Sequence, residues 1–271
     1  MPLPRLIATD LDGTLLRSDQ SISDRTCSTL KSCAAASLEV VIVTARPQRT
    51  VGGPARRIGC ASTAICANGA VVLDLASGVA DFVHGFTVGQ ALEIVAELRL
   101  LLPPGTGFAL ETGEEVFRDR TFRPGVISGV GSIVLDDVAT ARPASGRYVK
   151  VLARCPDASA DELLAAAAPV LAGRAEPSHS GGRGLLEIAP PGATKAGTLA
   201  WHCERLGLAA AEVVAFGDMP NDLPMLTWAG TAYAVANAHR DVLAAVDRVT
   251  ASNDEDGVAA ALDALLAAES V

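Results

Sequence analysis

Apolar residues in the first third of the chain occur in short continuous runs, and polar residues follow each run. The runs RLIATD, LEVVIVTAR and TAICAN are typical of strands that are buried on both faces, as in a parallel sheet covered by helices. Between the first two runs, the segment from Asp24 to Ala35 has helical spacing, and Ser21 or Ser23 can serve as its N-cap. The segments VVLDL and VADFVHGF predict a hairpin after the third run.

The pattern changes at about Thr87 and changes back after Pro191. A helix (VGQALEIVAELRLLL), turn-rich strands, a strand (RYVKVLARC), a second helix (DASADELLAAAAPVLA) and a last strand (LLEI) predict a separate α+β insertion. Beyond it, the strands VVAFGD and TAYAVAN alternate with helices, which predicts a doubly wound parallel sheet of the α/β class. We therefore expect a core domain in two parts, 1–84 and 188–271, with an inserted domain at 85–187.

Composition and charge narrow the possible functions. Of the 271 residues, 49% are hydrophobic and 20% are charged, which indicates a folded globular protein. A net charge of −9 and the absence of a basic run argue against a nucleic-acid partner. The chain has no leader-like start and no apolar run of about 18 residues, so we expect a cytoplasmic protein without a membrane partner. The six cysteines and four histidines show no metal-ligand spacing.

Polar side chains stand at the ends of several predicted strands. Because the carboxyl ends of parallel strands meet at one edge of a sheet, these side chains should converge there. They are Asp10, Asp12, Thr44, Arg46, Asn68, Asp218, Asn221 and Asp222. Four carboxylates at one edge repel one another unless a cation compensates them. Their hard oxygen ligands predict a Mg²⁺ site.

A phosphoryl group is the anion that fits beside such a cation. Thr44, at a strand end, and Lys195, at the start of a predicted helix, are suitable donors to its oxygens. Thr194 is a possible N-cap of that helix, whose dipole adds to the attraction for phosphate.

Four segments resemble, in this order, the four motifs of the haloacid dehalogenase (HAD) superfamily: DLDGTLL, VIVTARP, GATKAGTL and GDMPNDLPML. The insertion between the second and third motifs, with ICANGA before it and VANAHRDV after the fourth motif, resembles the Cof-type, sugar-phosphatase-like branch with an α/β type-2 cap. The resemblance implies a doubly wound parallel-sheet core, Rossmann-like in topology, with the inserted α+β domain acting as a cap over the site.

The resemblance also implies roles for the motif residues. Asp10 would be the nucleophile that forms an aspartyl-phosphate, and Asp12 the general acid and base. Thr44 and Lys195 would hold the phosphoryl oxygens. The Mg²⁺ ligands would be Asp10, the backbone carbonyl of Asp12, and Asp218, with Asp222 as a ligand or directly behind the ligands, and Asn221 would orient Lys195 or Asp222. Dehalogenase members lack the second aspartate, so Asp12 favours phosphate esters.

Other residues have two readings each. Arg46 could contact the substrate or form a structural ion pair. Asn68 and Gly69 could line the site or form a plain turn. The segment 178–180, including Ser180, could face the substrate from the cap or be a polar loop. Seven further polar residues of the cap are candidates that the sequence does not rank: Glu111, Glu114, Arg118, Arg120, Arg123, Lys150 and Arg183.

The predicted function is a Mg²⁺-dependent phosphatase for small phosphorylated metabolites, sugar phosphates in particular. Its partner would be a small-molecule phosphate ester, and the protein would be a monomer or a weak dimer. Alternatives are a phosphomutase, a dedicated sugar- or disaccharide-phosphate phosphatase, and a sensor that binds sugar phosphate without turnover. The presence of both Asp10 and Asp12 argues against the sensor, because binding does not require a proton-transfer carboxylate.

Overall fold

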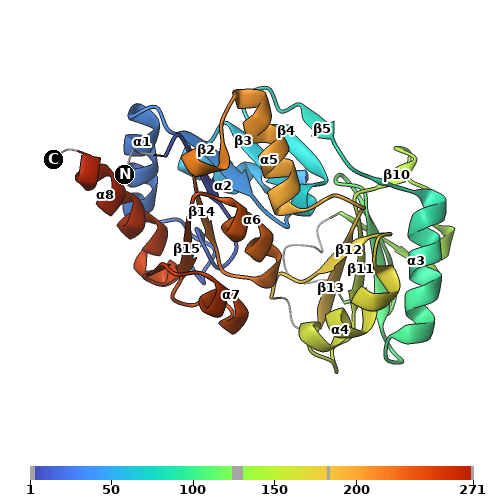
Figure 1. Ribbon diagram of the computed structural model, residues 1–271. Coiled ribbons are helices and arrows are strands. Elements are labelled where there is room, and N and C mark those ends of the chain that lie inside the picture. Colours follow the sequence, from blue (N-terminus) through green and yellow to red (C-terminus); the bar gives the residue numbers. More distant parts are fainter. Residues whose placement is uncertain (1–3, 124–130, 182–183, 270–271) are drawn as a thin grey trace.

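The computed structural model describes residues 4–123, 131–181 and 184–269. Two sheets organise the chain, and they lie side by side in Figure 1. The first sheet has the strand order β16-β15-β14-β1-β2-β3-β4-β5, parallel from β16 to β3 and antiparallel beyond. Its strands are β1 (Leu6–Thr9), β2 (Glu39–Val43), β3 (Thr63–Cys66), β4 (Val71–Asp74), β5 (Ala80–Phe82), β14 (Val213–Gly217), β15 (Thr231–Val235) and β16 (Val249–Thr250).

Helices cover this sheet and complete its core. They are α1 (Asp24–Ala35), α2 (Gly52–Ile58), α5 (Lys195–Leu206), α6 (Leu223–Trp228), α7 (Arg240–Ala245) and α8 (Gly257–Glu269). Helix α1 packs against α8, and α5 packs against α6. The strands β1, β2 and β14 are almost fully buried, which explains why their sequences read as unbroken apolar runs. The α/β class with a doubly wound parallel sheet is therefore confirmed.

The second sheet is built from the inserted segment and the two residues that follow it, 188 and 189. Its order is β12-β13-β11-β7-β8-β9, and helices α3 and α4 cover one of its faces. The elements of this region are β6 (Phe86–Thr87), α3 (Val88–Leu101), β7 (Gly107–Glu111), β8 (Val116–Asp119), β9 (Ser132–Leu135), β10 (Arg147–Tyr148), β11 (Lys150–Arg154), α4 (Ala160–Leu171), β12 (Glu176–Ser178) and β13 (Leu185–Ala189). Strands β6 and β10 form a separate two-stranded ribbon. We propose the division 1–84, 85–187 and 188–271 for the domains, with β13 extending two residues into the last part.

Local expectations from the sequence agree with most of these elements. Ser23 is the N-cap of α1, since its hydroxyl accepts a hydrogen bond from the Thr26 amide. Strands β4 and β5 form the predicted hairpin. Strand β16 was not predicted, because two residues are too short to show an apolar period.

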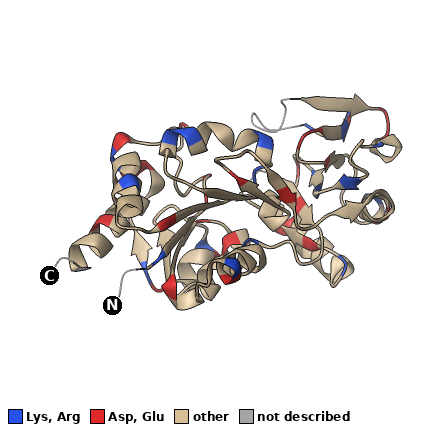
Figure 2. Cartoon of the chain, turned by 90° about the horizontal axis from the view of Figure 1, so that it is seen from above, with Lys and Arg blue, Asp and Glu red and all other residues tan. Residues whose placement is uncertain are grey.

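The helices and the positive charges of the described residues bear on possible partners. Across residues 4–123, 131–181 and 184–269, every helix is too short or too polar to cross a bilayer. Lys and Arg are spread along both parts of the chain instead of gathering in one segment (Figure 2).

Candidate active site

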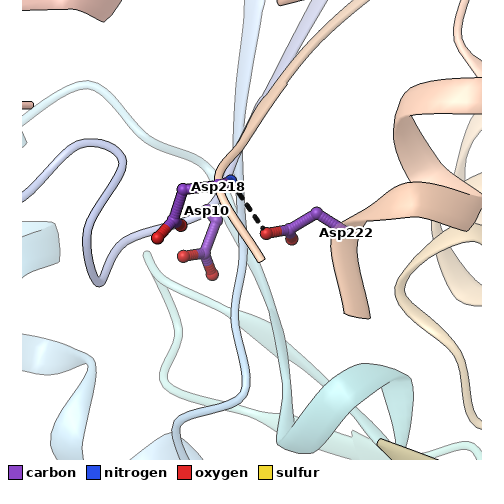
Figure 3. Close-up of side chains that lie close together, drawn as sticks. All are labelled: Asp10, Asp218 and Asp222. Atoms are coloured by element: carbon purple, nitrogen blue, oxygen red, sulfur yellow. Dashed lines mark hydrogen bonds between the residues drawn. The ribbon is translucent and has the colours of Figure 1, made fainter. Parts of the chain in front are cut away.

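Three carboxylates meet at the carboxyl edge of the first sheet. Asp10 directly follows β1, Asp218 directly follows the neighbouring β14, and Asp222 ends the short turn η5 (Pro220–Asp222). Each offers a carboxylate oxygen, and these oxygens lie within 4.8 Å of one another (Figure 3). All three side chains are buried. The predicted convergence of strand ends thus brings Asp10, Asp218 and Asp222 together.

Backbone geometry holds these carboxylates in place. Gly13 has a φ of +79°, and a Cβ at this position would lie 2.3 Å from Asp218 Oδ2, so no larger residue fits. The Thr14 hydroxyl donates to Asp218 Oδ1 at 2.7 Å. Asp222 Oδ2 accepts hydrogen bonds from the backbone amides of Asp218 and Met219, the first of which is the dashed line in Figure 3. The two partners of this bond are 204 positions apart in the sequence.

Lys195 lies between two of the three carboxylates. It is the first residue of α5, whose N-cap is Thr194 as expected. Its Nζ lies 2.7 Å from Asp10 Oδ1 and 2.7 Å from Asp222 Oδ1, and the side chain is buried. Burial disfavours the charged lysine, but the attraction of Asp10 and Asp222 outweighs it and raises the pKa of Lys195.

The carboxylates carry more negative charge than this one lysine offsets. Burial raises the pKa of Asp10 well above its ordinary value, against the lowering effect of Lys195, and the other carboxylates raise it further. Burial and Asp222 raise the pKa of Asp218 to about 7. Buried oxygen ligands with excess negative charge fit a hard divalent cation such as Mg²⁺.

Asp12 is not one of these three carboxylates, and it pairs with Arg46. The guanidinium donates from Nε to Asp12 Oδ2 at 2.6 Å and from Nη2 to Asp12 Oδ1 at 2.5 Å. The Arg46 amide donates to the hydroxyl of Thr44, which is fully buried at the end of β2. Of the two readings of Arg46, the structure therefore shows the ion pair. Its side chain also borders the cavity described next, so the ion pair and a substrate contact are geometrically compatible.

A cavity of about 370 Å³ separates the cluster from the second sheet. Asp10, Asp12 and Arg46 line it from the first sheet. The second sheet contributes Lys150 and Glu187, a buried ion pair. Lys150 Nζ also donates to the carbonyl oxygen of Ala45 at 2.8 Å, between Thr44 and Arg46. The second sheet thus forms a roof whose charged residues contact the loop that carries Thr44.

The remaining predicted site residues lie at the edge of this roof. Asn68 Nδ2 donates to Glu187 Oε2 at 3.2 Å, and Asn221 Nδ2 donates to Asn68 Oδ1 at 3.2 Å. The Ser180 hydroxyl donates to Glu187 Oε1, and Ser180 lines the cavity. We expected Asn221 to orient Lys195 or Asp222. In the structure the amide nitrogen of Asn221 donates to Asn68 instead.

The polar residues of the insertion that were candidates for substrate contacts lie in different places. Glu111 and Lys150 line the cavity. Glu114 accepts a hydrogen bond from Gln48. Arg118 and Arg120 bond within their own region. Arg123 is exposed, and Arg183 lies outside the described residues.

Comparison with known proteins agrees with this geometry. The family model of the haloacid dehalogenase-like hydrolases matches residues 7–262. The chain belongs to the haloacid dehalogenase-like hydrolases. One relative of this HAD-like protein is the 5-amino-6-(5-phospho-D-ribitylamino)uracil phosphatase YitU of Bacillus subtilis (strain 168), 28% identical, with 94% of this chain and 95% of that protein aligned.

Solved structures share the whole fold of this HAD-like hydrolase. SMU.1108c from Streptococcus mutans UA159 has a TM-score of 0.84 at 23% identity, covering 97% of this chain and 99% of that one. The HAD subclass IIB sugar phosphatase BT4131 has a TM-score of 0.77 at 19% identity, covering 96% and 98%. The resemblance to the haloacid dehalogenase superfamily is confirmed, the likeness to subclass IIB is one of fold, and the protein is a phosphatase, a hydrolase of phosphoric monoesters.

The site of the HAD-like hydrolase also contains one residue that sequence reasoning missed. Glu187 is buried and accepts hydrogen bonds from Lys150, Ser180 and Asn68, whereas its place in the sequence suggested only the end of the insertion. A signal was present: an acidic residue inside the apolar strand LLEI needs a buried partner.

The raised pKa of Asp218 makes the stability of the metal-free HAD-like protein depend on pH. The folded state holds the Asp218 proton up to about pH 7, whereas the unfolded state releases it near the ordinary value of 3.8. The contribution of protonated Asp218 to the free energy of unfolding is therefore fully present at low pH and is lost as the pH rises through 7. In EDTA, Asp218→Asn should gain on the order of 2 kcal/mol relative to wild type between about pH 5 and about pH 8. Urea unfolding measures this gain, and a pH-independent difference would contradict it.

Gly69 supports helix α5 of the HAD-like protein and lies outside the cavity lining. Its φ is +105°, and a Cβ would lie 2.4 Å from the Thr194 carbonyl oxygen. The Thr198 hydroxyl donates to the Gly69 carbonyl oxygen at 2.7 Å. Gly69→Ala is expected to cost about 3 kcal/mol or more, since it adds both strain and a backbone clash at the start of α5.

The matched control is Gly53→Ala. Gly53 lies in α2 with ordinary helical backbone, and a Cβ at this position would have no atom within 4 Å. That change should leave stability unchanged or raise it by about 0.5 to 1 kcal/mol. Equal unfolding temperatures of the two variants would show that the contact of Gly69 with α5 is unimportant.

Proposed function

We propose that the protein is a Mg²⁺-dependent phosphatase that hydrolyses small phosphorylated metabolites, sugar phosphates in particular, through an aspartyl-phosphate. The observation that carries this proposal is the buried set of three carboxylates, two of which pair with Lys195 and one of which, Asp10, lines the cavity. The arrangement supports binding of a divalent cation and a phosphoryl group side by side. The curated relative YitU, named for a phosphoribityl substrate, supports a small phosphorylated metabolite.

The residues that would hold Mg²⁺ are Asp10, Asp218 and the backbone carbonyl of Asp12. Asp222 already accepts from Lys195 with one oxygen and from two backbone amides with the other. We therefore assign Asp222 to positioning Lys195 and the loop of Asp218. Bound there, Mg²⁺ would neutralise charge that develops on the phosphoryl oxygens.

The chain's own residues would carry both chemical steps. A carboxylate oxygen of Asp10 attacks phosphorus, the bond to the leaving oxygen breaks, and Asp12 gives that oxygen its proton. Asp12 then takes a proton from water, which attacks phosphorus, releases phosphate and restores Asp10. Lys195 and Thr44 stabilise the phosphoryl oxygens throughout. Because Asp12 is held by Arg46 in this structure, it must turn from Arg46 toward the leaving oxygen.

The alternatives make different predictions for the same cavity. A phosphomutase would return the phosphoryl group to a sugar hydroxyl instead of to water. A sensor would bind the ester and leave it intact. The proposed proton-transfer residue, Asp12, is 35% exposed at its side chain and reaches solvent, which favours water as the acceptor.

Phosphate release from a panel of sugar phosphates and an aryl phosphate, with Mg²⁺ or with EDTA, tests the proposal. We expect turnover that requires Mg²⁺. Binding of sugar phosphates without any phosphate release would reject the phosphatase mechanism in favour of the sensor, and isomerised sugar phosphate as the product would favour the mutase.

A further inference from the structure

Side chains on β11 alternate between the two faces of the second sheet. Val151 and Ala153 pack in the core beneath α3 and α4, whereas Lys150 and Leu152 line the cavity. Lys150 is paired with Glu187 near the carboxylate cluster, and Leu152 is two residues further along the strand. The roof of the cavity therefore changes from charged to apolar along this strand.

Leu152 belongs to a small apolar cluster that is separate from the core beneath the helices. Phe122, which is 1% exposed, is another member, and Leu185 packs against them. All three side chains line the cavity. Transfer of a phosphoryl group requires polar partners and no apolar contact. These three side chains are therefore available to another part of the substrate, and covering their apolar surface stabilises the complex.

The charged side chains at the cavity are already paired. Every carboxylate that lines it, among the residues the structure describes, has a cationic partner: Asp10 with Lys195, Asp12 with Arg46, Glu111 with Arg49, and Glu187 with Lys150. Arg154 lies over the ring of Phe122 and is not part of the lining. A second anionic group on the substrate would lose hydration here without gaining an unpaired cation.

Asn221, which also lines the cavity, has a side-chain oxygen without a hydrogen-bond partner. The carboxylate of Glu187 can only accept, so Asn68 turns its amide nitrogen toward Glu187 and its oxygen toward Asn221. Asn221 in turn donates to Asn68, which leaves Asn221 Oδ1 buried without a hydrogen-bond partner. A substrate N–H or O–H group would satisfy this oxygen.

We propose that the cavity selects phosphate esters whose leaving group is uncharged and carries a flat ring, which packs against Phe122, Leu152 and Leu185. The inference rests on the proposed function and adds the class of leaving group to it. The volume of about 370 Å³ suits an alcohol of this size, since ligand sites commonly measure roughly 300 to 1,000 Å³.

Three substrates test separately the effect of a flat ring and the effect of a negative charge on the leaving group. Uridine 5′-monophosphate and ribose 5-phosphate share the phosphate and the sugar and differ in the flat base. Orotidine 5′-monophosphate adds one carboxylate to that base. With Mg²⁺, kcat/KM for the uridine compound should exceed that for ribose 5-phosphate by about tenfold, and the orotidine compound should be about tenfold poorer than the uridine compound.

Two matched variants test whether these ratios of kcat/KM depend on the apolar side chains of the cavity. Phe122→Leu should reduce the advantage of the uridine compound over ribose 5-phosphate. Phe108→Leu should preserve it, because Phe108 is equally buried but packs on the helix-covered face. Glu187→Gln frees Lys150 and should raise kcat/KM for the orotidine compound relative to the uridine compound.

The outcomes keep the two proposals apart. Equal kcat/KM for ribose 5-phosphate and the uridine compound, or an unchanged ratio in Phe122→Leu, would overturn the leaving-group inference and leave the phosphatase function intact. Absence of hydrolysis for every ester with Mg²⁺ would reject the proposed function and the inference together.

Discussion

Asp10→Asn is expected to lower kcat by about four orders of magnitude or more, because the amide cannot act as the nucleophile that accepts the phosphoryl group. Asp10 is the carboxylate that both lines the cavity and contacts Lys195. The substitution keeps the size of the side chain and leaves Lys195 paired with Asp222. The loss should therefore be chemical and not structural. Steady-state phosphate release with Mg²⁺, beside circular dichroism of the same sample, measures it.

The control for this prediction is Asp81→Asn. Asp81 is an exposed residue of β5 at the far edge of the first sheet, and its replacement should leave kcat within about twofold of wild type. Residual activity of Asp10→Asn above about one per cent of wild type would show that another group is the nucleophile.

Lys195→Met is expected to lower the free energy of unfolding by about 3 to 5 kcal/mol in EDTA, in addition to abolishing activity. The lysine is the cation shared by Asp10 and Asp222, and all three side chains are buried. Its removal leaves two buried carboxylates without compensation, and a loss of this size corresponds to a drop of roughly 10 °C in unfolding temperature. Lower pH should restore part of the stability, because protonation removes the uncompensated charges.

Lys31→Met is the matched control, since Lys31 is exposed on α1. Its unfolding temperature should stay within about 2 °C of wild type. Thermal unfolding of both variants at two pH values gives the comparison. A similar small change in the two variants would mean that Lys195 contributes little to holding the carboxylates together.

Most helices and strands of the fold could be predicted because they depend on patterns of neighbouring residues in the sequence. The runs that became β1, β2 and β14 are apolar throughout, as strands buried on both faces must be. Ser23 and Thr194 cap their helices with the side-chain bonds that their residue types favour. The strands β6 and β16 were not predicted, because each has two residues and no period to detect.

The sequence by itself determined the parallel α/β sheet, the inserted α+β segment and the carboxylates at the strand ends, because strand direction alone brings Asp10 and Asp218 to one edge. Only the tertiary structure decided the partners of the side chains. Arg46 pairs with Asp12, Asn221 donates to Asn68, and the buried pair of Lys150 and Glu187 forms the roof. These partners are separated by 34, 37 and 153 positions in the sequence, and side-chain contacts between such distant residues leave no period or spacing in it. The apolar wall of the cavity is of the same kind, since Phe122 and Leu152 read as ordinary core residues until the face on which they lie is known.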